Sequence, residues 1–100
     1  LGDWSGAEKN FSESIRRDPG NSFAYYRLAE VSTILKKDEQ ALWAALQLTA
    51  LEPHAEQHWR FLAEQFRARR DFATARRMLE KAERIHELAG GKPGNSRREL

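Results

Sequence analysis

Histidine is the residue type in this chain best suited to bind a metal ion or to exchange protons near neutral pH. His54 and His58 stand four residues apart, which would place both on one face of a helix near Glu52 or Glu56. Such a set could contact zinc or nickel. Two surface histidines in the first turn of a helix explain the same spacing, so we predict no metal site and no cofactor. His86 stands alone in the sequence.

The sequence signatures of catalysis are absent as well. The chain has no glycine-rich phosphate loop, no nucleophile elbow and no paired-carboxylate motif. It has no cysteine, which excludes disulfides and thiolate chemistry. We therefore predict that this protein is not an enzyme.

Length and composition indicate one small helical domain. The 100 residues are 40% hydrophobic and 32% charged, and valine occurs once. The net charge of +2 is unevenly spread, with −2 in residues 1–55 and +4 in residues 56–100. A basic second half could favour acidic partners or nucleic acid. We interpret it instead as an arginine-rich, solvated helical surface.

The sequence contains no signal that identifies a cellular compartment. No apolar run approaches the length of a membrane span and no signal peptide is visible, so we expect no membrane association and favour a cytoplasmic location. The chain starts at Leu1 rather than at methionine, and we expect it to be a piece of a longer protein.

A helical repeat organises the chain. The stretch 41–53 is apolar on nearly every side as a helix, which is typical of a central position, and Pro53 ends it. Pro19 precedes Pro53 by a 34-residue interval. The residues ahead of the prolines match at the same interval, in the sets Ala7, Ala41 and Ala75; Phe11, Ala45 and Leu79; and Ser14, Leu48 and Ala82. A period of this length indicates stacked helical repeats.

Turn and cap residues divide the sequence into five helices. We expect helices at 4–18 and 22–36, a central helix within 41–53, a fourth helix at 55–69 and a longer fifth helix that stops at Gly90-Gly91. The expected N-caps are Asp3, Ser22 and Asp71. The core face predicted for the fifth helix consists of Ala75, Met78, Leu79, Ala82 and Ile85.

The repeated positions resemble the tetratricopeptide repeat, a 34-residue helix–turn–helix with an aromatic–x2–Leu–Ala/Gly signature in its first helix. That signature is Tyr25-x2-Leu28-Ala29 here and recurs as Trp59-x2-Leu62-Ala63. The resemblance implies an all-α fold, a right-handed α-solenoid or superhelix of antiparallel helix hairpins with about two and a half repeats. Residues 1–21 would be the second helix of a truncated repeat, 22–55 and 56–89 two whole repeats, and 90–100 a flexible tail. Ser32 departs from the family, which usually has an aromatic residue there, and Lys36-Lys37-Asp38 is an unusual turn.

Members of this family mostly bind proteins, so the resemblance implies a scaffold or assembly module with a concave groove for a peptide or helix of a partner. The groove positions carried over from the family are Phe23, Tyr26, Arg27, Glu30, Ile34, Gln57, Arg60, Phe61, Glu64 and Arg67. Glu30 and Glu64 would repel the C-terminal carboxylate that some family members bind. We therefore expect a mixed-charge or partly basic ligand.

Self-association and RNA association are the alternatives. Trp43, Leu46 and Ala50 lie opposite the core face of the central helix and could form an exposed patch that meets another subunit. The repeat ends lack polar caps, so self-association or helix exchange could also occur there. The chain somewhat resembles the half-a-TPR repeats of RNA-processing scaffolds, although we expect nucleic acid not to be the partner.

Overall fold

The computed structural model describes residues 2–90, and every regular element in this range is an α-helix. The helices are α1 (Trp4–Arg17), α2 (Ser22–Ile34), α3 (Asp38–Leu51), α4 (Glu56–Ala68) and α5 (Phe72–Leu88). The expected all-α fold is confirmed, whereas the solenoid arrangement of the hairpins stays a prediction. In the described range no helix is long and apolar enough to cross a membrane. The expected flexible tail lies outside the described residues, apart from Gly90.

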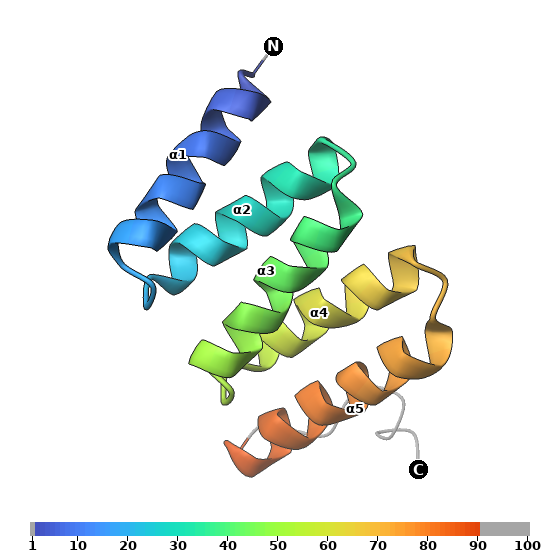
Figure 1. The fold of residues 1–100 in the computed structure, drawn as a ribbon. Coiled ribbons are helices and arrows are strands. Elements are labelled where there is room, and N and C mark those ends of the chain that lie inside the picture. Colours follow the sequence, from blue (N-terminus) through green and yellow to red (C-terminus); the bar gives the residue numbers. More distant parts are fainter. Residues whose placement is uncertain (1, 91–100) are drawn as a thin grey trace. The chain divides into compact units, whose positions relative to one another are not determined.

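Unit 1 comprises residues 1–52 and contains α1, α2 and α3. α2 lies between α1 and α3 and packs against both, as Figure 1 shows. The core of this unit is made largely of small residues, which allow the helices to approach closely. Its buried hydrophobic residues are Ala24, Tyr25, Leu28, Ala29, Val31, Ala41, Ala44, Ala45 and Leu48.

Unit 2 comprises residues 53–100 and contains α4 and α5, which pack together as a hairpin (Figure 1). Its buried hydrophobic residues are Leu62, Ala63, Ala75 and Ala82. The prediction that Leu79 belongs to the core is wrong, because this residue is 41% exposed. Met78 and Ile85 are half-buried. One neighbouring helix covers only one stripe of α5, so the positions at the edge of that stripe remain open to solvent.

Two of the three predicted N-caps are confirmed, while α3 and α4 begin without a side-chain cap and α3 begins at Asp38, ahead of the expected range 41–53. Asp3 accepts a hydrogen bond from the Gly6 N–H, and Asp71 accepts one from the Thr74 N–H, as predicted. The N-cap of α2 is Asn21, not Ser22. Ser22 begins the helix, and its hydroxyl lies 3.0 Å from Glu52 Oε2.

The same kind of contact holds the turn before α2 in unit 1 and the turn before α4 in unit 2. Tyr25 Oη donates to the carbonyl oxygen of Pro19 at 3.0 Å, and Trp59 Nε1 donates to that of Pro53 at 2.9 Å. The two donors are one repeat apart in the sequence, and so are the two acceptors. The repeated aromatic residue therefore fixes the preceding turn as well as filling space, and this explains why it stands six residues after each proline.

The turns inside the two hairpins also match. Lys36 and Arg70, again one repeat apart, are the non-glycine residues with positive φ in the described range, at 62° and 64°. Lys37 N–H donates to the Ser32 carbonyl at 2.8 Å, and Asp71 N–H donates to the Phe66 carbonyl at 2.9 Å. This is the six-to-one bond of a Schellman motif, which requires a left-handed residue at the helix end.

Ser32 is accommodated by a polar network in place of an aromatic ring. Ser32 is fully buried, and Gln40 Nε2 lies 2.8 Å from its hydroxyl oxygen. Gln40 also donates to Glu8 Oε2 at 2.7 Å, and Lys37 Nζ donates to the same carboxylate at 2.7 Å. The network satisfies a buried polar group and ties α1 to the α2–α3 turn.

Candidate protein-binding surfaces

The first candidate surface is the outer face of α2, defined by Phe23, Tyr26, Arg27, Glu30 and Ile34. At 100° per residue these five positions lie on one stripe of the helix. Phe23 at one end is 63% exposed and Ile34 at the other is 48% exposed. The three residues between them are half-buried. The structure therefore brings together all the α2 positions that the sequence predicted.

The charges on the α2 face are satisfied within unit 1. Arg27 donates to Glu30 Oε1 at 2.6 Å, and its guanidinium lies 5.8 Å from the ring centre of Phe11 in α1. The Glu30 carboxylate raises the pKa of Tyr26 above its usual value, because a nearby negative charge disfavours the phenolate. Since α2 carries no other charged residue, its face has no net charge.

The second candidate surface is the α4 face in unit 2, defined by Gln57, Arg60, Phe61, Glu64 and Arg67. Phe61 is half-buried, and the other four are exposed. Arg67 lies 3.6 Å from the Glu64 carboxylate, with both side chains more than 60% exposed. Water screens such a pair strongly, so both groups stay accessible to a ligand.

Arg60 on the α4 face belongs to a network that joins α4 to α5. Its guanidinium lies 3.2 Å from Glu56 Oε2 and 3.7 Å from Glu83 Oε1. His86 Nδ1 lies 2.7 Å from Glu56 Oε1. The hydrogen bond with His86, aided by Arg60, lowers the pKa of Glu56 below its usual value. His86, which stands alone in the sequence, is thus paired in the fold with a carboxylate 30 residues away.

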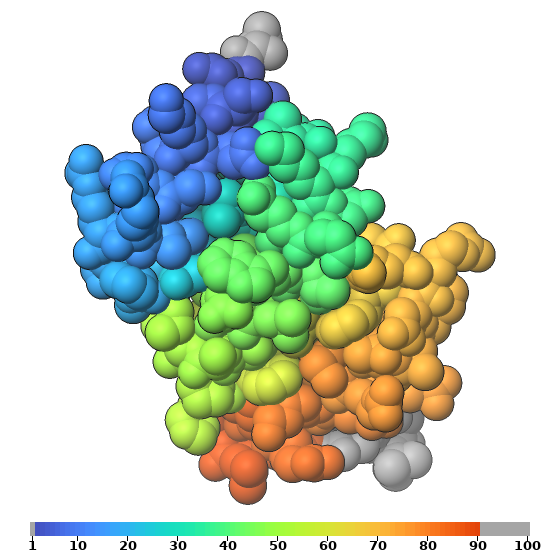
Figure 2. Space-filling model, viewed as in Figure 1, coloured from blue at the N-terminus to red at the C-terminus, as the bar shows by residue number. Residues whose placement is uncertain are grey.

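The third candidate surface is the α3 patch in unit 1, defined by Trp43, Leu46 and Ala50. Trp43 is 46% exposed and Leu46 is 42% exposed, while Ala50 is also exposed. Part of the surface of α3, in green, is open to the viewer in Figure 2. The Trp43 ring lies against the buried Tyr25, with 5.7 Å between the ring centres. The patch predicted from the sequence is therefore an exposed apolar surface.

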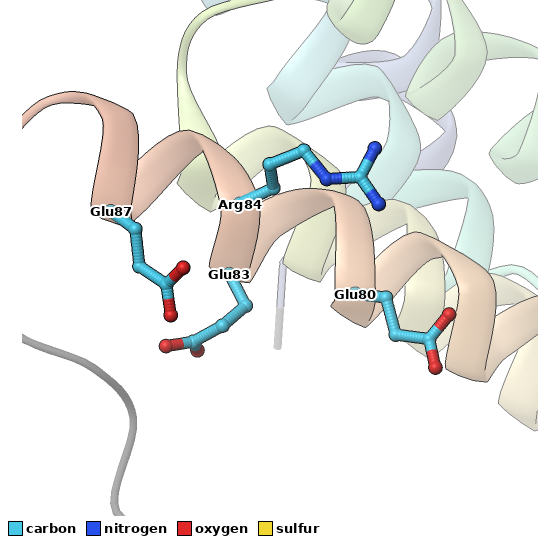
Figure 3. A pocket seen from close by; sticks show the side chains of 4 residues that line it. All are labelled: Glu80, Glu83, Arg84 and Glu87. Carbon is cyan, nitrogen blue, oxygen red and sulfur yellow. The ribbon is translucent and has the colours of Figure 1, made fainter. Parts of the chain in front are cut away.

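A pocket of about 250 Å³ on α5 was not predicted from the sequence. It is lined by Glu80, Glu83, Arg84 and Glu87, which are all on one helix. Figure 3 shows the three glutamates on one side of the helix and Arg84 on the other. The spacing of the glutamates was visible in the sequence, but a charged strip on a helix is ordinarily a solvated surface.

The histidine pair singled out from the sequence forms no metal centre in this structure. His54 is exposed before α4 begins, and His58 is half-buried in its first turn. Glu56, which could have joined them, instead contacts His86 and Arg60. In residues 2–90 no three metal-binding side chains come together in a way that could hold an ion.

No model of a protein family matches the chain, and no curated protein is similar to it.

Proposed function

We propose that this chain is a non-catalytic protein-binding module of tetratricopeptide-like repeats, which holds a peptide or helix of a partner on the α2 face of unit 1 or on the α4 face of unit 2. The aromatic–proline contact and the hairpin turn both recur at the interval of one repeat, and this recurrence supports the repeat. Each face lies within its own unit, so each can be tested separately.

The observation that carries the proposal is the exposure of Phe23. A phenylalanine side chain that leaves 63% of its surface in water gains little from folding. Phe23 also shares a stripe with Tyr26 and Arg27, and aromatic and arginine side chains are enriched among the residues that dominate binding energies. A partner that covers this stripe would bury apolar area without having to break a buried polar contact.

The two faces differ in the ligand chemistry that each suits. The internal Arg27–Glu30 ion pair leaves the α2 face neutral, and its exposed ends, Phe23 and Ile34, favour apolar side chains at both ends of a polar middle. The α4 face carries Arg60, Arg67 and Glu64, of which the last two are highly exposed, and it suits a mixed-charge segment. A free carboxylate gains nothing at Glu30 or Glu64.

The test is selection of peptides from a random displayed library on the immobilised protein, followed by affinity measurements with purified peptides. Phe23→Ala should weaken binding of the selected peptides by about tenfold or more, as expected for an exposed aromatic side chain that the partner covers. Phe72→Ala is the matched control, because Phe72 is a similarly exposed phenylalanine on neither face. Failure to select any peptide, or equal affinity for the Phe23 variant and the wild type, contradicts the proposal. Preferential selection of acidic C-terminal peptides contradicts the ligand preference.

A further inference from the structure

The outward face of α3 after its first turn is apolar where the matching positions of the neighbouring repeats carry mostly charged side chains. From Gln40 to Leu51 the helix has no charged residue, although it is exposed at Trp43, Leu46 and Ala50. The corresponding positions one repeat earlier and later are Lys9, Ser12 and Arg16, and Arg77, Glu80 and Arg84. The repeat itself therefore does not require apolar residues here, and an explanation specific to α3 is needed.

Trp43 is held in place by its neighbours. Its ring lies at 52° to the ring of Tyr25, and Tyr25 is anchored in turn by its hydrogen bond to Pro19. Tyr25 is only 5% exposed. A large aromatic side chain fixed against a buried ring offers contact area at little cost in conformational entropy, which is a property of binding residues.

We propose that the α3 patch binds the same patch on a second copy of the chain, with the two α3 helices antiparallel about a two-fold axis between Leu46 and Gln47. Seven residues separate Trp43 from Ala50, so both lie on one line along the helix. In the antiparallel pair, Trp43 of each copy faces Ala50 of the other, and a large side chain meets a small one on both sides of the axis. Leu46 meets Leu46 of the second copy, and the two Gln47 amides can hydrogen-bond to each other.

The distribution of charge on α3 permits a second copy to approach, and the area of the patch sets the strength of the contact. Two identical charged faces would repel each other, whereas α3 carries its charges only in the first turn, at Asp38 and Glu39, and is uncharged from Gln40 to Leu51. With Trp43 46% exposed and Leu46 42% exposed, the patch offers about 250 Å² per copy or about 500 Å² for the pair, well below the roughly 1,200 Å² of total buried area in a stable complex. The dimer is therefore weak and reversible and forms only at high protein concentration.

The test is sedimentation equilibrium of the wild type and three variants of the whole chain, from about 10 µM to 1 mM. The wild type should shift from the monomer mass of 11.6 kDa toward twice that mass. Trp43→Ala should weaken the dimer about tenfold by removing the large residue. Ala50→Trp should weaken it as much, because two indoles then collide. The double variant W43A/A50W should restore association to within a few-fold of the wild type, since the large–small pairing is exchanged.

A second measurement tests the pairing without changing Trp43. Leu46→Glu and Leu46→Lys place like charges at the two-fold axis, so each should be monomeric alone, while their mixture should form a heterodimer. Phe72→Ala, an exposed aromatic residue on α5, should leave association unchanged. Three results would overturn the proposal: a monomeric wild type at 1 mM, a double variant no stronger than the single ones, or an equal mixture of the two Leu46 variants that stays monomeric. The α3 patch shares no residue with the α2 and α4 faces, so none of these three results would affect the proposed function.

Discussion

Replacing Lys36 by glycine should stabilise unit 1, because Lys36 ends α2 in the left-handed backbone region. Its φ of 62° costs an L-residue roughly 1–2 kcal/mol. Glycine avoids this cost but loses about 0.5–1 kcal/mol through the greater freedom of the unfolded chain. Lys36 is exposed, so little else should change. The net gain in free energy of unfolding should be about 0.5–1 kcal/mol, or about 2–8 °C in Tm.

Arg70→Gly in unit 2 is the matched substitution, and its gain should be smaller. Arg70 has nearly the same φ of 64°, but its guanidinium also lies 5.9 Å from the ring centre of Phe72. Losing this exposed cation–π contact removes about 0.5 kcal/mol. The predicted order of stability is therefore Lys36→Gly, then Arg70→Gly, then wild type.

The assay is urea unfolding of each variant, followed by circular dichroism at 222 nm. Lys36→Ala is the control, because it removes the lysine charge but keeps the Cβ and hence the strain. The alanine variant should have the stability of the wild type to within about 0.5 kcal/mol. If Lys36→Gly were no more stable than Lys36→Ala, the backbone conformation would not be a source of strain and the reasoning would be refuted.

Three further changes test contacts within unit 1. Tyr25→Phe should lower the free energy of unfolding by about 1 kcal/mol in the same urea assay, because it removes the hydrogen bond to Pro19 but keeps the ring; no loss would mean that this bond does not stabilise the turn. Ala29→Leu should cost about 1–3 kcal/mol, because Ala29 is fully buried and a larger side chain overpacks the core. Hydrogen bonds from Lys37, and also Gln40, hold the pKa of Glu8 below its ordinary value of 4.5. The stabilisation from Glu8 is therefore fully present above pH 4.5 and is lost as the pH falls through the lowered pKa. Glu8→Gln should therefore flatten the decline of Tm between about pH 5 and 3, and an unchanged slope would show that the network does not contribute.

The candidate surfaces could be predicted from the sequence to the extent that helical geometry determines them. Once a helix is placed by its caps and by the proline that ends it, the residues that share a stripe follow from 100° per residue. Trp43 and Leu46 were expected on an outward face for this reason, whereas Phe23 and Ile34 were taken from the resemblance to the tetratricopeptide repeat; all four are exposed. The pairing of the charges was not predictable in the same way. Arg60 contacts Glu83 only because α5 lies beside α4, and the sequence does not give the distance between helices.

By itself, the sequence determined the features that depend on residues close together along the chain. The helix positions, the Asp3 and Asp71 caps and the period of the repeat all arise from local hydrogen bonding and backbone preferences. The tertiary structure decided which apolar positions are covered and which charges meet. Leu79 repeats the buried Ala45 yet remains exposed, and His86 finds Glu56 across the hairpin. Burial and ion pairing depend on what a neighbouring helix brings to a position, which cannot be read from the residue at that position alone.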